Sequence, residues 1–345
     1  MAKPKILQIL SMYHPEGERL LRQEAEVIQT DRYDIAHLCE RVKDMDGILV
    51  RAPAKITREV IDAAPSLKII SGSGVGLDNI DLKYATDKNI PVLHAPSING
   101  VSTAEHAITL IMALSKSLVS FHEEMRKGNY NSRMTLQSRE LRGKRVGIVG
   151  LGNIGKEVAK RVKLGLEMEV TAWIRKNDKN KQELADKLGI KLTTSLDEIF
   201  FESDFVTLHI PLNLHTQGFI NRHHFSLMKP TAYFVNTARG VIVNQDDLYE
   251  VLSDGRIAGA GLDVYDLEPP AKDLALLSLP NVILTPHVGG TTVECNYIGA
   301  TTVAKNILRF FAGERPETIA NPEVLDNLVD ESEMINGFID EISKN

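Results

Sequence analysis

Cysteine is scarce in this sequence, with only Cys39 and Cys295 among 345 residues. Two cysteines cannot build a disulfide framework or a cysteine-rich metal site, and this scarcity is typical of a reducing compartment. Long apolar runs are also missing, since the apolar segment at residues 6–10 is too short for a signal-peptide core or a membrane span. We therefore expect a cytoplasmic protein with neither a membrane span nor a metal centre.

A strong excess of charge of one sign is absent as well. The formal net charge is −6, with 40 lysine and arginine residues interspersed among 46 aspartate and glutamate residues. Because no basic block or stripe interrupts this mixture, nucleic acid is excluded as the main partner. At roughly 150 residues per domain, the length predicts about two domains, each able to bury its own core.

What the sequence does contain is a glycine-rich turn between an apolar strand and a helix. Residues 146–149 are apolar, and Gly150, Gly152 and Gly155 follow in the spacing G-x-G-x-x-G. The first glycine permits a tight turn, the second leaves room for a phosphate against the backbone, and the third lets the helix pack closely on the sheet. The helix start adds free N–H donors and the positive end of its dipole. The pattern predicts a binding site for a dinucleotide pyrophosphate.

Short apolar runs alternate with helix-like segments throughout the chain, which indicates parallel sheets covered by helices. In the first part, apolar runs at residues 6–10, 47–50, 68–71 and 91–94 alternate with helical segments at 18–27, 58–63 and 81–87. In the second part, the candidate strands are residues 146–149, 170–174, 205–210, 232–236, 258–264 and 282–285. We expect an α/β protein with two doubly wound parallel sheets, the second belonging to a complete dinucleotide-binding domain.

The order of these segments predicts how the domains are divided. A long amphipathic helix that starts near Thr103 or Ala104 would connect the two domains, and a helix at residues 292–311 would return to the first domain before a polar tail. The predicted divisions are residues 1–102 for the first part of a substrate domain, 103–288 for the dinucleotide-binding domain, and 289–345 for the return and the tail. The active cleft is expected between the domains, outside the carboxyl ends of the strands.

Three polar residues follow apolar strands of the second domain: Arg239, Glu268 and His287. Each alone is ordinary, as a solvated arginine, a turn-ending glutamate or a hydrogen-bonded histidine. Together, downstream of a dinucleotide motif, they supply what hydride transfer to a 2-keto acid requires without a metal. Arg239 can bind a carboxylate through two hydrogen bonds, and His287 can give a proton to the developing alkoxide. Glu268, hydrogen-bonded to the other ring nitrogen, would favour the imidazolium.

Several motifs in register make the chain similar to a known family. In chain order they are GVGLDNID at 74–81, APSINGVSTAE at 95–105, GLGNIG at 150–155, NTARG at 236–240, DVYDLEP at 263–269 and TPHVGG at 285–290. This set, within about residues 45 to 312, resembles the D-isomer-specific 2-hydroxyacid dehydrogenases. The resemblance implies a Rossmann NAD(P)-binding domain inserted into a flavodoxin-like substrate domain. It also implies a homodimer that acts on a small 2-keto or 2-hydroxy acid.

The resemblance also implies functions for individual residues. Arg239, Glu268 and His287 would be the catalytic set, and the backbone N–H groups of Val75 and Gly76 would hold the substrate carboxylate, with Arg239 and His287. Asp263 would contact the nicotinamide amide. The residues expected to line the cofactor are Thr103, Gly150, Gly152, Asn153, Ile154, Gly155, Ile174, Arg175, Lys176, Pro211, Thr216, Thr237, Ala238, Arg239, Asp263, His287 and Gly290.

One position departs from the pattern of NAD-using members. An acidic residue typically closes the second strand, about 20 residues after the last glycine, and binds the adenosine ribose. Here Ile174 occupies that place, and two cations, Arg175 and Lys176, follow it. Without the carboxylate nothing repels a 2′-phosphate, and the two cations can bind one, which slightly favours NADP(H) over NAD(H). The alternative is that both cations are solvated and NAD binds without the acidic contact.

The substrate and one other class of function stay open at the sequence level. Arg51 follows a strand of the first domain and would help to bind a phosphorylated substrate, although a cleft-edge ion pair accounts for it equally well. Hydroxypyruvate, glyoxylate and 3-phosphohydroxypyruvate are the substrates we expect. The alternative is an NAD(H)-gated binding protein, similar to the C-terminal-binding-protein corepressors, that keeps the site but acts through partners.

Overall fold

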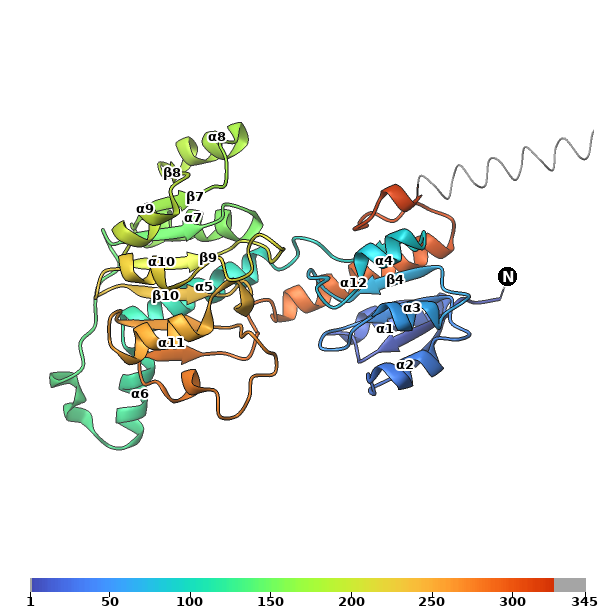
Figure 1. The fold of residues 1–345 in the computed structure, drawn as a ribbon, viewed down its shortest axis with the longest axis horizontal. Helices are drawn as coiled ribbons and strands as arrows, with labels where there is room; N and C mark the ends of the chain where they lie inside the picture. Colours follow the sequence, from blue (N-terminus) through green and yellow to red (C-terminus); the bar gives the residue numbers. More distant parts are fainter. Residues whose placement is uncertain (1, 326–345) are drawn as a thin grey trace, which may run out of the picture. The chain divides into compact units, whose positions relative to one another are not determined.

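In the computed structural model, which describes residues 2–325, the chain forms two compact units (Figure 1). Among the described residues, the first unit contains those up to Ile98 together with those from Val293 to Leu325, and the second contains Asn99–Thr292. The chain thus leaves one domain, builds the other completely, and returns. The predicted divisions at 102/103 and 288/289 compare with observed divisions at 98/99 and 292/293. The predicted polar tail, after residue 325, lies outside the described residues.

The first unit is a five-stranded parallel sheet with the strand order β2-β1-β3-β4-β5. Its strands are β1 (Lys5–Ile9), β2 (Glu26–Thr30), β3 (Gly47–Val50), β4 (Ile69–Gly72) and β5 (Val92–Leu93). Its helices are α1 (Pro15–Glu24), α2 (Ile35–Arg41), α3 (Arg58–Asp62), α4 (Leu82–Asp87) and α12 (Val293–Phe311). The order 2-1-3-4-5 is that of flavodoxin-like folds, as expected.

Two apolar clusters cover the two faces of this sheet. On one face, α1 and α12 pack together and bury Leu21, Val303 and Ile307 against Ile6 and Ile69 of the strands. The other face is covered by residues of α2, α3 and α4. Since every residue of β3 and β4 is buried, the near-continuous apolar runs seen in the sequence are explained by helices on both sides of a parallel sheet.

The second unit is a seven-stranded parallel sheet with the order β12-β11-β10-β9-β6-β7-β8. Its strands are β6 (Arg145–Val149), β7 (Glu169–Trp173), β8 (Lys191–Thr193), β9 (Phe205–Leu208), β10 (Tyr233–Asn236), β11 (Gly259–Leu262) and β12 (Val282–Leu284). Its α-helices are α5 (Gly100–Ser115), α6 (Leu118–Arg126), α7 (Asn153–Gly165), α8 (Lys179–Leu188), α9 (Leu196–Glu202), α10 (Arg222–Leu227) and α11 (Gln245–Ser253), and η1 (Tyr130–Met134), η2 (Gly240–Ile242) and η3 (Ala275–Ser278) are 3₁₀ turns. Counted from β6, the order is the Rossmann order 3-2-1-4-5-6 with one added strand.

Several elements differ from the expectation. The helix predicted at residues 18–27 ends at Glu24, because Ala25 turns extended and residues from Glu26 form β2 beside β1. The three-residue edge strand β8 was not predicted, since it is too short for an alternating pattern to stand out. The connecting helix α5 starts at Gly100, so that Thr103 lies in its first turn.

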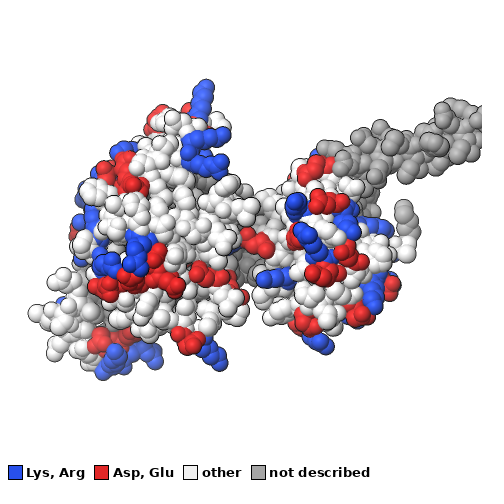
Figure 2. All heavy atoms as spheres, viewed as in Figure 1, with Lys and Arg blue, Asp and Glu red and all other residues white. Residues whose placement is uncertain are grey.

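No helix among the described residues is long and apolar enough to cross a membrane. The structure also contains no group of three or more His, Cys, Asp or Glu side chains, within residues 2–325, that could hold a metal ion. On the face drawn in Figure 2, acidic and basic side chains lie interspersed over both units.

Candidate active site

The catalytic candidates lie together because of the strand order of the second sheet. Arg239 follows β10, Glu268 lies in the loop after β11, and His287 follows β12, and these three parallel strands are neighbours. Parallel strands place their carboxyl ends at the same edge of a sheet, which is where ligands bind in open α/β folds. Residues separated along the chain by dozens of positions are thereby brought to one edge.

His287 and Glu268 form a direct pair at this edge. The Nδ1 atom of His287 lies 2.6 Å from Oε2 of Glu268, and Oε1 of Glu268 accepts a hydrogen bond of 3.1 Å from the backbone N–H of Tyr265. Burial of Glu268 opposes its ionisation, but the hydrogen bond and charge of His287, the Tyr265 N–H and the charge of Arg239 together hold the pKa of Glu268 below its usual value. The pair therefore contains an ionised carboxylate at neutral pH.

The backbone around Arg239 is shaped by its neighbours. The Asn236 side chain accepts a hydrogen bond from the Ala238 N–H and donates one to the Arg239 carbonyl, each of 3.0 Å, and so closes the turn after β10. A side chain at Gly240 would lie only 1.9 Å from the Tyr265 carbonyl carbon. Only glycine lets this turn lie against the backbone that leads to Glu268, which brings the charge of Arg239 close to the carboxylate.

The backbone of His287 is in the left-handed region, with φ of 54°. Few residues with a side chain adopt this conformation, and those that do are held by their surroundings. The hold here comes from Asp263, at the end of β11, whose carbonyl accepts the His287 N–H at 2.8 Å. The Asp263 carboxylate accepts the N–H groups of Val288 at 2.9 Å and Gly289 at 2.8 Å.

Two residues that the sequence analysis did not single out complete this arrangement. Thr285 Oγ1 lies 2.6 Å from Oδ1 of Asp263, and Nε2 of His106, on α5, lies 3.0 Å from Thr285 Oγ1 and 3.4 Å from Asp263 Oδ1. His106 stands three positions after Thr103, on the helix that was expected to contribute to the site. This helical spacing is the one signal in the sequence that could have identified it.

The glycine-rich turn has the geometry that each glycine predicted. Gly150 has φ of +100°, and a side chain there would lie 2.7 Å from the His209 carbonyl. A Cβ at Gly155 would lie 2.0 Å from the Gly150 carbonyl oxygen, whereas a Cβ at Gly152 would meet no atom within 4 Å. Gly152 is the N-cap of α7, so the open space lies directly at the helix start, in front of Asn153 and Ile154. The turn has the shape that accommodates a pyrophosphate.

Buried polar atoms without partners mark further places for a ligand. Within the described residues, Oγ1 of Thr103, Oγ1 of Thr237 and Nδ1 of His209 are buried and make no hydrogen bond. Such groups are costly unless something pairs with them. Thr103 lies next to Gly290, whose added Cβ would be 3.8 Å from its Oγ1, and Thr237 lies at the carboxyl end of β10. Together with the open glycine turn, these atoms fit a nicotinamide dinucleotide.

His209 was also missed from the sequence, although it directly precedes the Pro211 loop. Burial lowers its pKa to about 3, and its Nε2 atom lies 3.0 Å from Thr207 Oγ1. It is therefore neutral at physiological pH. In the loop that follows, Oγ1 of Thr216 donates to the Pro211 carbonyl at 2.8 Å, so that Thr216 braces the loop.

The residues that follow β7, the second strand of this unit, are those expected to lie beside the adenosine ribose of the cofactor. Ile174 follows β7 directly and is buried in the apolar cluster beneath α5, α7 and α8. Arg175 and Lys176 are exposed, and in the part of the chain that the structure describes neither makes a hydrogen bond or an ion pair. The side chains thus present two solvated cations and no carboxylate.

Arg51, Val75 and Gly76 belong to the first unit. Arg51 follows β3, its guanidinium lies 4.9 Å from the ring centre of Tyr13, and its Nε atom is buried without a partner among the described residues. Val75 and Gly76 follow β4, and neither backbone N–H donates a hydrogen bond within residues 2–325. His94 instead contacts the Val75 carbonyl, at 3.1 Å. Two free amides and a partly buried cation therefore lie at carboxyl ends of neighbouring strands.

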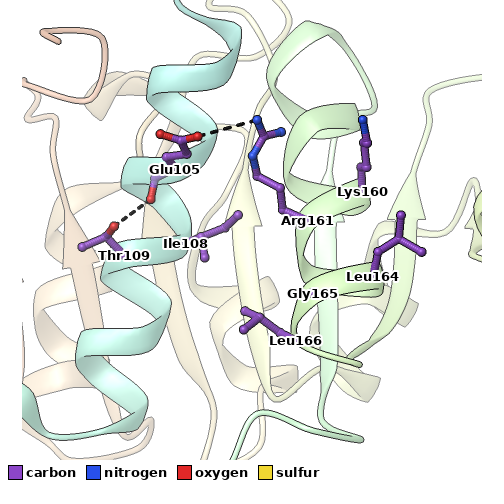
Figure 3. Close-up of a pocket in the computed structure, with 8 residues that line it drawn as sticks. All are labelled: Glu105, Ile108, Thr109, Lys160, Arg161, Leu164, Gly165 and Leu166. Carbon is purple, nitrogen blue, oxygen red and sulfur yellow. Dashed lines mark hydrogen bonds and ion pairs between the residues drawn. The ribbon is translucent and has the colours of Figure 1, made fainter. Parts of the chain in front are cut away.

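A separate pocket of about 580 Å³ lies between α5 and α7 of the second unit (Figure 3). Its lining combines the apolar side chains of Ile108, Leu164 and Leu166 with Glu105 and Arg161, which face each other across the two helices. None of the predicted site residues lines it, so it is a distinct surface feature.

Comparison with known proteins shows the family of this chain. Residues 108–289 match the family model "D-isomer specific 2-hydroxyacid dehydrogenase, NAD binding domain". A glyoxylate reductase of Pyrococcus furiosus is 38% identical over 94% of this chain and 97% of its own length. A D-3-phosphoglycerate dehydrogenase of Methanocaldococcus jannaschii is 37% identical over 89% of this chain, which spans 58% of the length of that relative.

A similar solved structure is an NADPH-dependent glyoxylate/hydroxypyruvate reductase of Sinorhizobium meliloti in complex with NADP and malonate. It is 28% identical, has a TM-score of 0.83, and the match covers 92% of this chain and 97% of that one. The two-domain α/β fold expected from the sequence is therefore also that of a solved relative.

Proposed function

Because the chain belongs to the family of D-isomer-specific 2-hydroxyacid dehydrogenases, we propose that it interconverts a small 2-keto acid and its D-2-hydroxy acid with NAD(P)H. The observation that carries this proposal is the 2.6 Å contact between His287 and Glu268, with Arg239 in the turn that follows the neighbouring strand β10. A proton donor, its ionised partner and a cation that can bind a carboxylate lie at one edge of a sheet whose glycine turn fits a dinucleotide.

The acid–base step is assigned to one nitrogen of His287. Because Nδ1 contacts Glu268, Nε2 is left for the substrate, and among the described residues it makes no hydrogen bond. When bound, the reduced nicotinamide supplies the hydride. Nε2 gives its proton to the alkoxide oxygen that forms at the keto carbon, and takes a proton back in the oxidative direction. The Glu268 carboxylate stabilises the imidazolium that must be present before reduction.

Arg239 is proposed to orient the substrate. Its guanidinium can hold a carboxylate through two parallel hydrogen bonds, which fixes the keto carbon beside the proton donor. The free N–H groups of Val75 and Gly76 are the second proposed contact to the carboxylate, and Arg51 the proposed contact to a distal polar group. The names of the relatives support glyoxylate, hydroxypyruvate or a 3-phosphoglycerate-type compound as the substrate class.

For the cofactor we propose NADPH in preference to NADH. The support is that Arg175 and Lys176 are exposed cations without partners in the described structure, and that Ile174 replaces the acidic residue expected in NAD-using members. A 2′-phosphate would gain two charge-assisted contacts there. The solved relative with bound NADP is consistent with this preference. Binding of NADH without these contacts is the alternative.

We also propose a homodimer, supported by α6 and the turn that follows it. No residue of α6 is buried, and an apolar set is exposed along this segment: Leu118, Val119, Met125, Tyr130 and Met134. Figure 1 shows that α6 extends away from the sheet of its own unit. An isolated chain gains nothing from these side chains, whereas a second copy would bury them.

The decisive experiment measures initial rates of NADPH and NADH oxidation, side by side, with glyoxylate, hydroxypyruvate, pyruvate and 3-phosphohydroxypyruvate. We expect turnover with at least one acid and a higher kcat/KM with NADPH. The double variant Arg175→Ser/Lys176→Ser should raise the KM for NADPH about tenfold or more and leave that for NADH unchanged. Lys272→Ser, which removes another exposed cation of the same unit, serves as the control.

The outcomes of this experiment separate the hypotheses. Tight cofactor binding without turnover of any acid would favour the NAD(H)-gated binding protein over the enzyme. An equal effect of the double variant on both cofactors would contradict the proposed phosphate contact.

A further inference from the structure

The Asp263 carboxylate is an ionised group in an almost completely buried place. The residue is 1% exposed, and its burial would raise its pKa, but hydrogen bonds from His106, Thr285, Val288 and Gly289 instead lower it. A buried carboxylate is stable only when its oxygens are hydrogen-bonded. Here its donors come from α5 and from the turn that carries His287.

The hydrogens of this network can be assigned from its distances. Because ionised Asp263 can only accept, the hydroxyl of Thr285, at 2.6 Å, must donate its single proton to Oδ1. Thr285 Oγ1 then has only lone pairs left for His106, at 3.0 Å, so Nε2 of His106 must be the protonated nitrogen. The result is a chain of directed hydrogen bonds, from His106 through Thr285 to Asp263.

This chain ends on the backbone of the catalytic turn. Asp263 receives the N–H groups of residues 288 and 289 through its carboxylate and that of His287 through its carbonyl. These contacts hold His287 in its left-handed conformation. The turn is also closely packed against these residues, because a Cβ at Gly289 would lie 3.0 Å from Oδ2 of Asp263 and 3.4 Å from the His106 ring.

We propose that His106, Thr285 and Asp263 act as positioning residues for His287, holding the 287–289 turn so that Nδ1 meets Glu268 and Nε2 faces the substrate. The inference rests on the proposed function of His287, and it gives Asp263 a role in addition to the expected contact with the nicotinamide amide. The titratable and charged groups around the turn are Glu268, Tyr265, Asp263, Arg239 and His106.

The test uses two matched pairs of substitutions. Thr285→Val keeps the shape of the side chain and removes the hydroxyl, whereas Thr285→Ser keeps the hydroxyl. His106→Leu removes the donor, whereas the amide of His106→Gln can replace Nε2. We expect Thr285→Val and His106→Leu to lower kcat for keto-acid reduction about tenfold or more and to move the alkaline limb of its pH profile to lower pH. The Ser and Gln variants should recover most of both properties.

Three controls distinguish positioning from other roles. The Kd for NADPH, the Tm and the NMR titration of the His287 ring, assigned with His287→Gln, are measured for every variant. Positioning predicts a lower titration midpoint in Thr285→Val with the Kd and Tm close to those of the unchanged protein. Loss of cofactor affinity alone, or a lower Tm with an unchanged titration and pH profile, would overturn the inference. Because the NMR titration needs no turnover, it remains decisive even if the proposed reaction is wrong.

Discussion

At the scale of single residues, the proposed chemistry depends on how the two nitrogens of one imidazole are used. His287 places Nδ1 against Glu268, which in the proposed mechanism leaves Nε2 for the substrate, and its backbone lies in the left-handed region. Glu268 stays ionised because its pKa lies below the usual value. Its stabilising effect on the imidazolium is therefore present at neutral and mildly acidic pH, and is lost only as the pH falls through that lowered pKa.

The substitution Glu268→Gln tests this pair. An amide cannot stabilise the imidazolium by charge, so His287 loses its proton at a lower pH and the alkaline limb of the reduction profile should move to lower pH. We expect kcat at pH 8 to fall about tenfold or more, with little change in the Kd for the cofactor. The exposed Glu183, on α8, provides the control Glu183→Gln. A profile that coincides with that of the control would show that Glu268 does not act on His287.

At the scale of elements, the strand–turn–helix unit from β6 to α7 contains one glycine that is needed for packing and another that borders the proposed binding site. Gly155 lies against the carbonyl oxygen of Gly150, while Gly152 borders open space at the start of the helix. Glycine is thus required by packing at position 155, whereas at position 152 it leaves space that we propose for the ligand. A methyl group added at each position should affect different properties.

Gly155→Ala and Gly152→Ala make this distinction measurable. A Cβ at Gly155 would lie 2.0 Å from a backbone oxygen, so the helix must shift, and the free energy of unfolding should fall by about 1–3 kcal/mol. Gly152→Ala should unfold like the unchanged protein but raise the Kd for NADPH about tenfold or more, because the methyl group occupies the space in front of the helix start. Denaturant unfolding and cofactor titration measure the two effects. If Gly152→Ala bound NADPH normally, this turn would not hold the pyrophosphate.

At the scale of the whole molecule, the chain combines two parallel sheets of different strand order, and the second unit is inserted between the first sheet and the helix α12 that returns to it. Each unit buries its own core, and five of the large apolar side chains that remain exposed lie along the short segment of α6 and η1. The proposed dimer would bury these side chains, and the net charge of −6, from interspersed acidic and basic residues, is no strong excess of one sign.

Light scattering should give a mass twice that of the 38.2 kDa chain. The double variant Tyr130→Glu/Met134→Glu places two charges on the segment after α6, where the side chains are 60% and 78% exposed, and should shift the mass to that of a single chain. Phe201→Glu, at a side chain that is 65% exposed on α9, is the matched control and should leave the dimer intact. A single-chain mass for the unchanged protein, or a dimer that persists in the double variant, would contradict the proposed interface.

Much of the fold followed from short-range patterns in the sequence. Residues 47–50 form β3 with the predicted bounds, because a buried parallel strand must be apolar throughout. The glycine spacing predicted the turn after β6, since Gly150 and Gly155 answer local steric demands, whereas Gly152 borders open space. The edge strands β2 and β8 were missed, because half-exposed or very short strands lack a continuous apolar run.

The sequence by itself predicted most of the buried strands and the glycine-rich turn, because these depend on residue type and spacing within one segment, and it named three catalytic candidates from the residues that follow three separate strands. Only the tertiary structure decided which distant groups meet. The contact between His106 and Thr285 joins residues 179 positions apart. It depends on the strand order β12-β11-β10 and on the packing of α5 against the sheet, and no single segment of the sequence specifies either of these. Hydrogen bonds of this kind depend on atomic distances across the sheet, which no local pattern specifies.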